Sequence, residues 1–208
     1  MHPYSVESMI RSSIKLYSIT LSVVIFLILE ETGVIEKLIN IQDTYPVISE
    51  LSRFSLFSIA FTPFIIYKTL FLLFDKWLWK WSFISKWTGI PNLNGSYKGI
   101  LISSFDKEKQ IDMELCISQT FTHISFVSTF GDSSSNSSLA RIIRDNDLIT
   151  CLDFIYENQS DDFNVESGHH TGVNQLTFNK KKNTLSGRYF NDRGTQPNKG
   201  RIKLQRIN

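Results

Sequence analysis

Arginine and aromatic residues alternate near the C-terminus of this 208-residue chain. Arg188, Tyr189, Phe190 and Arg193 all lie within the segment GRYFNDR, residues 187–193. A guanidinium matches the oxygens of a phosphate with parallel N–H donors, and an aromatic ring offers a stacking surface for a base. The segment therefore predicts a site for a small phosphorylated ligand. In a strand, Arg188 and Tyr189 face opposite ways, so at most one points into a closed sheet unless a bulge intervenes.

The charge is distributed unevenly along the chain. Residues 170–208 contain nine Lys and Arg against one acid, a net charge of +8, whereas residues 92–169 carry a net charge of −7. The basic segment suits a phosphate site, but it equally suits a solvated edge or a face that lies against anionic lipid. The whole chain carries only +2, so no polymeric nucleic acid is expected as a partner.

The sequence offers no set of residues for catalysis. It has no glycine-rich phosphate loop and no usefully spaced pair of carboxylates, and the run SSSNSS at residues 133–138 is typical of a flexible loop. His123, His169 and His170 lack the spaced partners of a zinc site. Cys116 and Cys151 are too few for a disulfide framework and are expected as free thiols. We therefore expect a protein that is not an enzyme and needs no metal or cofactor.

The first part of the chain, residues 1–89, contains two long apolar runs at about 12–29 and 54–74. Each run is close to the length that crosses a bilayer core, and Pro63 and Lys68 within the second are tolerated there. All four tryptophans alternate with lysines over residues 76–87, a pattern typical of a membrane–water interface. This pattern predicts two transmembrane helices and a Trp/Lys-rich juxtamembrane segment. A cleaved signal peptide and a buried helical hairpin are the alternatives.

The charges that flank these runs predict the topology. Residues 30–53 carry a net charge of −3, and residues 68–86 carry +3. Basic flanks stay on the cytoplasmic side. The chain is therefore expected in the bacterial inner membrane as a multi-pass protein with both termini in the cytoplasm.

The second part, residues 90–208, changes to an apolar period of two. In residues 111–118, Ile111, Met113, Leu115 and Ile117 alternate with polar or small side chains, which is typical of a half-buried antiparallel strand. The other expected strands are residues 95–103, 121–130, 139–145, 148–156, 172–178, 184–191 and 200–207. Eight short strands without a helix predict a small antiparallel β-barrel, or a sandwich. The expected fold class is thus a membrane protein with an all-β domain.

The order of these segments resembles a known family. Two membrane helices precede LNGSYKGILISS (residues 93–104), ISQTFTHISF (117–126), LDFIYEN (152–158), HTGVNQLTF (170–178), LSGRYFNDR (185–193) and GRIKLQR (200–206). This arrangement is similar to the two-transmembrane β-barrel effectors of CBASS anti-phage defence, which are associated with CD-NTases. The resemblance implies that the barrel receives a cyclic oligonucleotide, such as a cyclic dinucleotide, from a cognate CD-NTase. It further implies homo-oligomerisation, disruption of the inner-membrane lipid and death of the host cell.

The resemblance and the residue types together give a set of candidate ligand-binding residues. They are Tyr97, Tyr156, Arg188, Tyr189 and Arg193, with Arg141 and Thr171 as weaker candidates. Many relatives are expected to carry Trp where this chain has Tyr97. Lys68, inside an apolar run, is the candidate for the membrane output. The competing functions are a membrane-tethered, lipocalin-like carrier of an apolar small molecule and a membrane scaffold whose barrel is solid.

Overall fold

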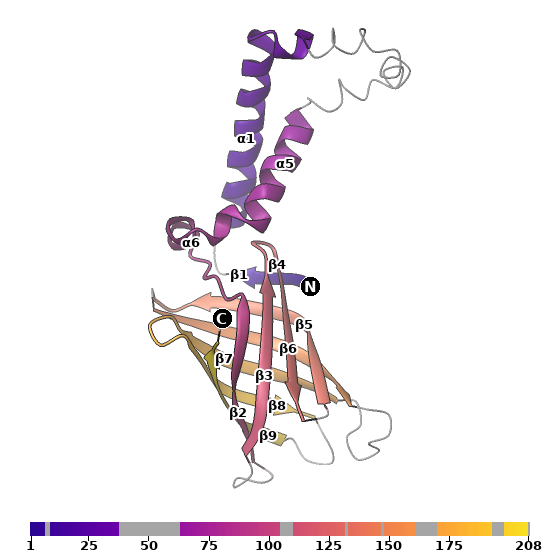
Figure 1. Ribbon diagram of the computed structural model, residues 1–208, viewed down its shortest axis with the longest axis vertical. Helices are drawn as coiled ribbons and strands as arrows, with labels where there is room; N and C mark the ends of the chain where they lie inside the picture. The colour runs from indigo at the N-terminus through magenta and orange to yellow at the C-terminus, as the bar shows by residue number, and fades with distance from the viewer. Residues whose placement is uncertain are drawn as a thin grey trace. The chain divides into compact units, whose positions relative to one another are not determined.

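The structure, a computed structural model, describes residues 1–6, 9–37, 63–104, 110–131, 133–146, 148–160, 170–192 and 198–207. The chain divides into two compact units: Met1–Glu7 with Trp79–Asn208, and Ser8–Leu78 (Figure 1). The expected boundary after residue 89 therefore lies inside the first unit. Residues 79–89 and the N-terminal seven residues belong with the β-rich domain.

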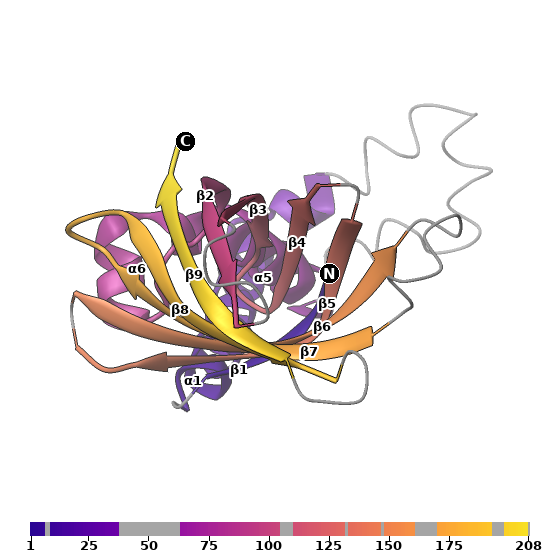
Figure 2. The same cartoon turned by 90° about the horizontal axis from the view of Figure 1, so that it is seen from below.

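The first unit is built on an almost entirely antiparallel sheet. Its described strands are β1 (His2–Val6), β2 (Gly95–Ser103), β3 (Gln110–Gln119), β4 (His123–Phe130), β5 (Ser133–Arg144), β6 (Ile149–Ser160), β7 (His170–Asn179), β8 (Thr184–Asn191) and β9 (Asn198–Arg206). The pairings run β4-β3-β2-β9-β8-β7-β6-β5 and return to β4, so the sheet closes into a barrel (Figure 2). Closure leaves few unpaired edges for aggregation.

All eight strands expected from the sequence are present, and two sequence predictions require correction. The serine run at residues 133–138 is not a loop, because it forms the first half of β5 and pairs with β4 and β6. The second correction is β1, a strand that the sequence did not predict. Five residues without a clear period of two carry too little signal to be distinguished from an unstructured terminus.

Strand β1 fills the place where β4 and β5 separate. It pairs antiparallel with β4 at His2 and Pro3 and parallel with β5 at Tyr4, Ser5 and Val6. The Tyr4 side chain is buried, and its hydroxyl donates a hydrogen bond of 2.9 Å to the carbonyl of Phe121. The N-terminus is therefore an integral part of the barrel.

The interior of the barrel differs between its two ends. Near the β3–β4, β5–β6 and β7–β8 turns it is filled with large side chains, and the rings of Phe126 and Phe154 stack there with centroids 4.1 Å apart. Toward the other end the inward positions of the same strands change to Ser128 on β4 and Asn158 on β6. Smaller, polar side chains cannot fill that end of the barrel.

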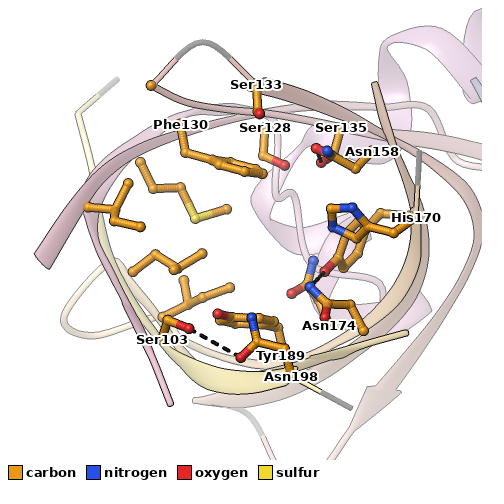
Figure 3. Close-up of a pocket in the computed structure, with 17 residues that line it drawn as sticks. Ser103, Ser128, Phe130, Ser133, Ser135, Asn158, His170, Asn174, Tyr189 and Asn198 are labelled. Atoms are coloured by element: carbon orange, nitrogen blue, oxygen red, sulfur yellow. Dashed lines mark hydrogen bonds between the residues drawn. The ribbon is translucent and has the colours of Figure 1, made fainter. Parts of the chain in front are cut away.

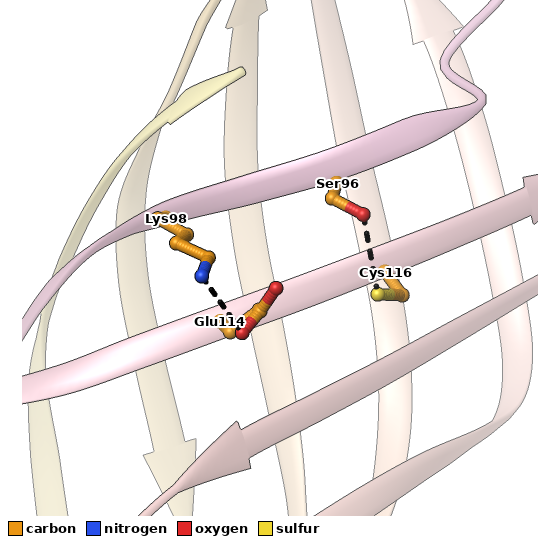
Figure 4. Close-up of polar contacts among 4 residues, drawn as sticks. All are labelled: Ser96, Lys98, Glu114 and Cys116. Carbon is orange, nitrogen blue, oxygen red and sulfur yellow. Dashed lines mark hydrogen bonds and ion pairs between the residues drawn. The ribbon is translucent and has the colours of Figure 1, made fainter. Parts of the chain in front are cut away.

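The outer wall of the barrel is formed by the side chains that alternate with the inward-facing ones along each strand. On β2 and β3, Lys98 and Glu114 are register partners joined by an ion pair of 3.4 Å, and Ser96 lies opposite Cys116 at 3.5 Å (Figure 4). Both cysteines are free, as expected from the sequence. The outer face of β2 and β3 is therefore polar at these positions, and the half-buried pattern predicted from residues 111–118 is confirmed.

A short connection precedes β2 and belongs to the first unit from Trp79 onward. It consists of the 3-10 helix η1 (Leu78–Lys80) and the helix α6 (Ser82–Thr88). The Trp79 side chain is fully buried, whereas Trp81 and Trp87 are exposed. The tryptophan segment therefore does not behave as one uniform interfacial belt, since one of its rings belongs to the folded core.

The second unit contains the helices α1 (Ile10–Glu31) and α5 (Pro63–Lys76), which lie side by side. Among the described residues, α1 is the one helix long and apolar enough to cross a membrane. The expected second span, residues 54–74, lies partly outside the described residues, and α5 has only 14 residues. Within the described residues, the structure thus supports one candidate span, and the first part of the expected second span lies outside them.

Candidate functional site

A cavity of about 350 Å³ occupies the polar end of the barrel (Figure 3). Each of the strands β2–β9 contributes two side chains to its lining, together with Gly131. One wall is apolar and consists of Leu101, Ile111, Met113, Phe130 and Ile202. The remainder is rich in hydroxyl and amide groups, from Ser103, Ser128, Ser133, Ser135, Asn158, Asn174, Asn191 and Asn198. A cavity of this size that is apolar on one side and polar on the other suits a small molecule.

Two tyrosines, Tyr156 and Tyr189, are positioned in the cavity by glycines on the neighbouring strands. Tyr156 pairs with Gly172, and Tyr189 pairs with Gly200. A Cβ atom at either glycine would overlap the ring of the paired tyrosine. Each ring therefore lies over the bare backbone of its partner strand, which a larger residue would not allow. The two pairs fix where the aromatic surfaces of the cavity stand.

Some of the hydroxyl and amide groups in the polar wall form hydrogen bonds with one another. The Ser135 hydroxyl donates to Asn158 Oδ1 at 3.0 Å, and the Ser103 hydroxyl donates to Asn198 Oδ1 at 3.1 Å. Asn174 differs, because its Oδ1 is buried and has no hydrogen-bond partner among the described residues. A buried acceptor without a donor costs about 1–3 kcal/mol. A ligand that brings an N–H or O–H group to Asn174 would remove this cost.

Burial changes the protonation equilibrium of one of these tyrosines, Tyr156. It raises the pKa of Tyr156 from 10.0 to about 12, and the hydrogen bond from Asn191 opposes this only in part. The Tyr156 hydroxyl can therefore donate to a ligand at neutral pH. The ring also contacts His170 edge to face, with centroids 6.3 Å apart. His170 belongs to the described lining, and its ring nitrogens are hydrogen-bonding groups.

The structure brings together two of the candidate residues named from the sequence, Tyr156 and Tyr189. Tyr97 points inward but packs in the filled end, where its hydroxyl donates to the Leu93 carbonyl at 2.9 Å and its ring meets Phe178. Burial raises the pKa of Tyr97 to about 12, and the Arg206 guanidinium opposes this shift. Tyr97 is thus placed away from the cavity.

The cationic candidates do not converge on the cavity. Arg188 lies on the outer wall, where its Nε donates to Gln175 Oε1 at 3.2 Å and its guanidinium lies 5.4 Å from the Phe190 ring. The prediction that only one of Arg188 and Tyr189 points inward is thereby confirmed. Arg141 and Thr171 are also exposed on the outside of their strands. Arg193 lies outside the described residues.

The sequence reasoning missed most of the hydroxyl and amide lining. A usable signal was present, because Ser133 and Ser135 alternate within the serine run and Asn158 follows Tyr156 by two residues on β6. Polar residues at the inward phase of a strand mark the edge of a cavity. The inward or outward phase of these serines becomes visible only when the run is assigned to a strand.

A closed barrel with a cavity of aromatic, amide and hydroxyl groups defines a small-molecule-binding β-barrel. Residues 88–206 match the Cap15 cyclic dinucleotide receptor domain, and the chain belongs to this family. Over 129 residues it is 30% identical to CD-NTase-associated protein 15 of Yersinia aleksiciae. That match spans 62% of this chain and 62% of the length of the relative. The resemblance found in the order of sequence motifs is confirmed for the family, whose description is of a receptor domain and not of an enzyme.

Proposed function

We propose that the barrel cavity binds a cyclic dinucleotide signal made by a partner CD-NTase. The observation that carries the proposal is the pairing of two aromatic surfaces, Tyr156 and Tyr189, with a buried polar wall. That wall contains Asn174 Oδ1, which has no hydrogen-bond partner in the described part of the chain. A nucleotide needs both features, because its bases stack on rings and its base edges and ribose hydroxyls form hydrogen bonds. An apolar carrier would need a drier interior, and a solid scaffold would have no cavity.

The phosphates of such a ligand are held mainly by neutral donors. The described lining contains no Lys or Arg, so the phosphate oxygens are assigned to the serine hydroxyls of β4 and β5, to amide N–H groups and to His170. Arg193 remains a proposed additional cation, since it follows the cavity residue Asn191 by two positions in the sequence. We assign at most an indirect effect on ligand binding to the residues on the outer wall, Arg141, Thr171 and Arg188.

The test is thermal denaturation of the full-length protein in non-ionic detergent with a panel of cyclic dinucleotides. A ligand at a hundredfold above its dissociation constant stabilises the folded state by about 2.7 kcal/mol. We expect one or a few members to raise the Tm. Tyr189→Ala should abolish the rise, whereas Arg188→Ala, the adjacent outward residue, should retain it. No rise with any member, or equal loss in both variants, would overturn the cavity as the binding site.

We further propose that the chain crosses the inner membrane twice and keeps both termini in the cytoplasm. Residues 1–7 and 79–208 form one folded unit, so they must lie on the same side of any membrane. If α1 crosses, an even number of crossings is required, and residues 54–74 supply the second. On α1, Leu16, Leu21, Leu27 and other apolar side chains are exposed, which favours lipid around this helix over a protein core.

Labelling with a membrane-impermeant maleimide tests this topology in intact and permeabilised cells. In a Cys151→Ser background, Cys116 on the outer wall of the barrel and a cysteine introduced by Ser5→Cys on β1 should both react only after permeabilisation. A cysteine introduced by Asp43→Cys, between the two apolar runs, should react in intact cells. Labelling of Ser5→Cys and Cys116 from opposite sides would rule out a hairpin.

The output proposed for the ligand-bound state is oligomerisation and disruption of the inner membrane, which kills the host cell in anti-phage defence. Lys68 on α5 is the residue proposed to act in this step, because it is an exposed cation on an apolar helix. In liposomes, the ligand should trigger dye release from the wild-type protein, and Lys68→Leu should reduce the release more than Lys76→Leu at the helix end. Dye release that does not depend on the ligand would contradict the proposed coupling.

A further inference from the structure

Cationic side chains gather at the filled end of the barrel, away from the dinucleotide cavity. A small recess of about 70 Å³ there is lined by Lys86 of α6, Arg144 at the end of β5 and Lys180 in the β7–β8 turn. Ser85, Asn146 and Thr150 add polar groups, and none of the described residues that line the recess is acidic. We call this the basic recess.

Contacts to the backbone fix the Arg144 guanidinium and position the residues that carry the other two cations. The Arg144 guanidinium lies against Gly89, the residue that ends α6, and its Nη1 donates to the carbonyl of Lys86 at 3.4 Å. The Lys180 amide donates to the Leu148 carbonyl at 2.9 Å, which joins the β7–β8 turn to the β5–β6 turn. A guanidinium has five N–H donors, so Arg144 can bind the carbonyl and an anion together.

The surroundings of the basic recess are positive as well. Lys181 and Lys182 line an open depression next to it, and Asn146 belongs to both. The exposed Asp145 accepts a contact of 3.5 Å from the Asn146 amide. By sequence the β5–β6 turn also includes Asp147, so the five Lys and Arg residues of the recess and the depression outnumber the two acids of this turn. A net positive recess of this size suits one phosphate group.

The helix α6 beside the basic recess presents aromatic side chains to the outside. Ile84 and Thr88 face the core, while Phe83 and Trp87, four residues apart on the other face, are 69% and 53% exposed. Trp81, just before the helix, is 58% exposed. Exposed tryptophans interspersed with lysines are typical of residues at a membrane–water interface. This neighbourhood points to lipid as the source of the phosphate.

We propose that the basic recess binds the phosphate of an anionic lipid headgroup. Arg144 supplies the planar donors, Lys86 and Lys180 supply compact charges from either side, and the exposed rings of α6 rest among the headgroups. None of the residues assigned to this site lines the dinucleotide cavity. The proposal therefore stands independently of the proposed signal receptor.

Native mass spectrometry of the full-length protein in non-ionic detergent tests the proposal directly. We expect adducts of phosphatidylglycerol to be retained in preference to phosphatidylcholine. The triple variant Lys86→Gln, Arg144→Gln and Lys180→Gln should lose these adducts by about tenfold, the factor expected for loss of one charge-assisted hydrogen bond. The matched control carries Lys199→Gln, Arg201→Gln and Lys203→Gln on the exposed face of β9, an equal change in charge.

Equal losses in the two triple variants, or equal retention of the two lipids, would overturn the site. A different result is that inorganic phosphate stabilises the wild-type protein but not the triple variant, while phosphatidylglycerol stabilises neither. That result would overturn the assignment to lipid. Lys180→Glu, an exposed turn substitution, provides the same test if the triple variant does not fold. The thermal shift caused by a cyclic dinucleotide should persist in all these variants, which separates a failure here from a failure of the cavity assignment.

Discussion

The ring of Tyr156 occupies the space over Gly172, its register partner on the neighbouring strand. A methyl group at Gly172 would overlap that ring, so the glycine and the tyrosine form one unit of the cavity wall. The same relationship recurs between Tyr189 and Gly200. Two of the aromatic surfaces that we assign to the ligand therefore depend on glycines that cannot contact the ligand through a side chain.

Substitution Gly172→Ala should displace the Tyr156 ring. Overpacking of this kind costs about 1–3 kcal/mol in the free energy of unfolding, and the ligand-induced rise in Tm should shrink. The measurement is a double-mutant cycle in denaturant. In a Tyr156→Ala background the alanine has room, so Gly172→Ala should there cost much less. Additive costs in the double variant would show that the two residues are not coupled.

Substitution Asn174→Leu should have opposite effects on stability and on binding. It removes a buried acceptor without a described partner, so the unliganded protein should become more stable by about 1 kcal/mol. The same change should weaken binding of the cyclic dinucleotide, because the ligand loses an acceptor. Thermal denaturation with and without ligand measures both. A loss of stability without ligand would mean that Asn174 already has its partner, such as an ordered water.

Alkaline pH should destabilise the barrel over a defined range. Burial raises the pKa of Tyr97 and Tyr156 from 10.0 to about 12, so the folded protein holds these two protons more tightly than the unfolded chain. The stabilisation is therefore complete below pH 10 and is lost as the pH rises toward about 12. Phenolate absorbance and Tm, measured together, should show two tyrosines that ionise late. Ionisation of every tyrosine near pH 10 in the folded protein would contradict this prediction.

The stacked pair Phe126 and Phe154 should be a main source of stability at the filled end. Both rings are almost completely buried, so Phe154→Ala should cost about 3–5 kcal/mol in the free energy of unfolding. Ile155→Ala, at the next position but on the outer, half-buried face, should cost far less. Equal costs in urea denaturation would argue against the assigned phase of β6.

The N-terminal strand should be required for full stability of the barrel. Tyr4→Ala removes a buried ring and its hydrogen bond to the Phe121 carbonyl, and we expect a loss of about 2–4 kcal/mol. Ser5→Ala, exposed at the next position of β1, is the control and should be nearly neutral. If Tyr4→Ala were equally neutral, β1 would not be a structural part of the domain, and the argument for an even number of membrane crossings would lose its support.

The sequence by itself determined where eight of the strands lie and which family the chain belongs to. The period of two placed eight strands, with residues 95–103 and 184–191 matching β2 and β8 at both ends. It also showed that Arg188 and Tyr189 must face opposite ways. These are local properties, since strand phase and apolar run length are set by neighbouring residues. The order of the segments was enough to recognise the family.

Tertiary structure alone decided which residues share the cavity. Tyr97 and Tyr156 carry equivalent sequence signals, but closure of the barrel places Tyr97 in the filled end and Tyr156 in the cavity. The serines of β5 and the strand β1 acquire their roles only through pairing with residues more than a hundred positions away or across a turn. The register between distant strands sets these contacts, and it depends on the patterns of both strands and on the turns together, so one segment alone does not give it.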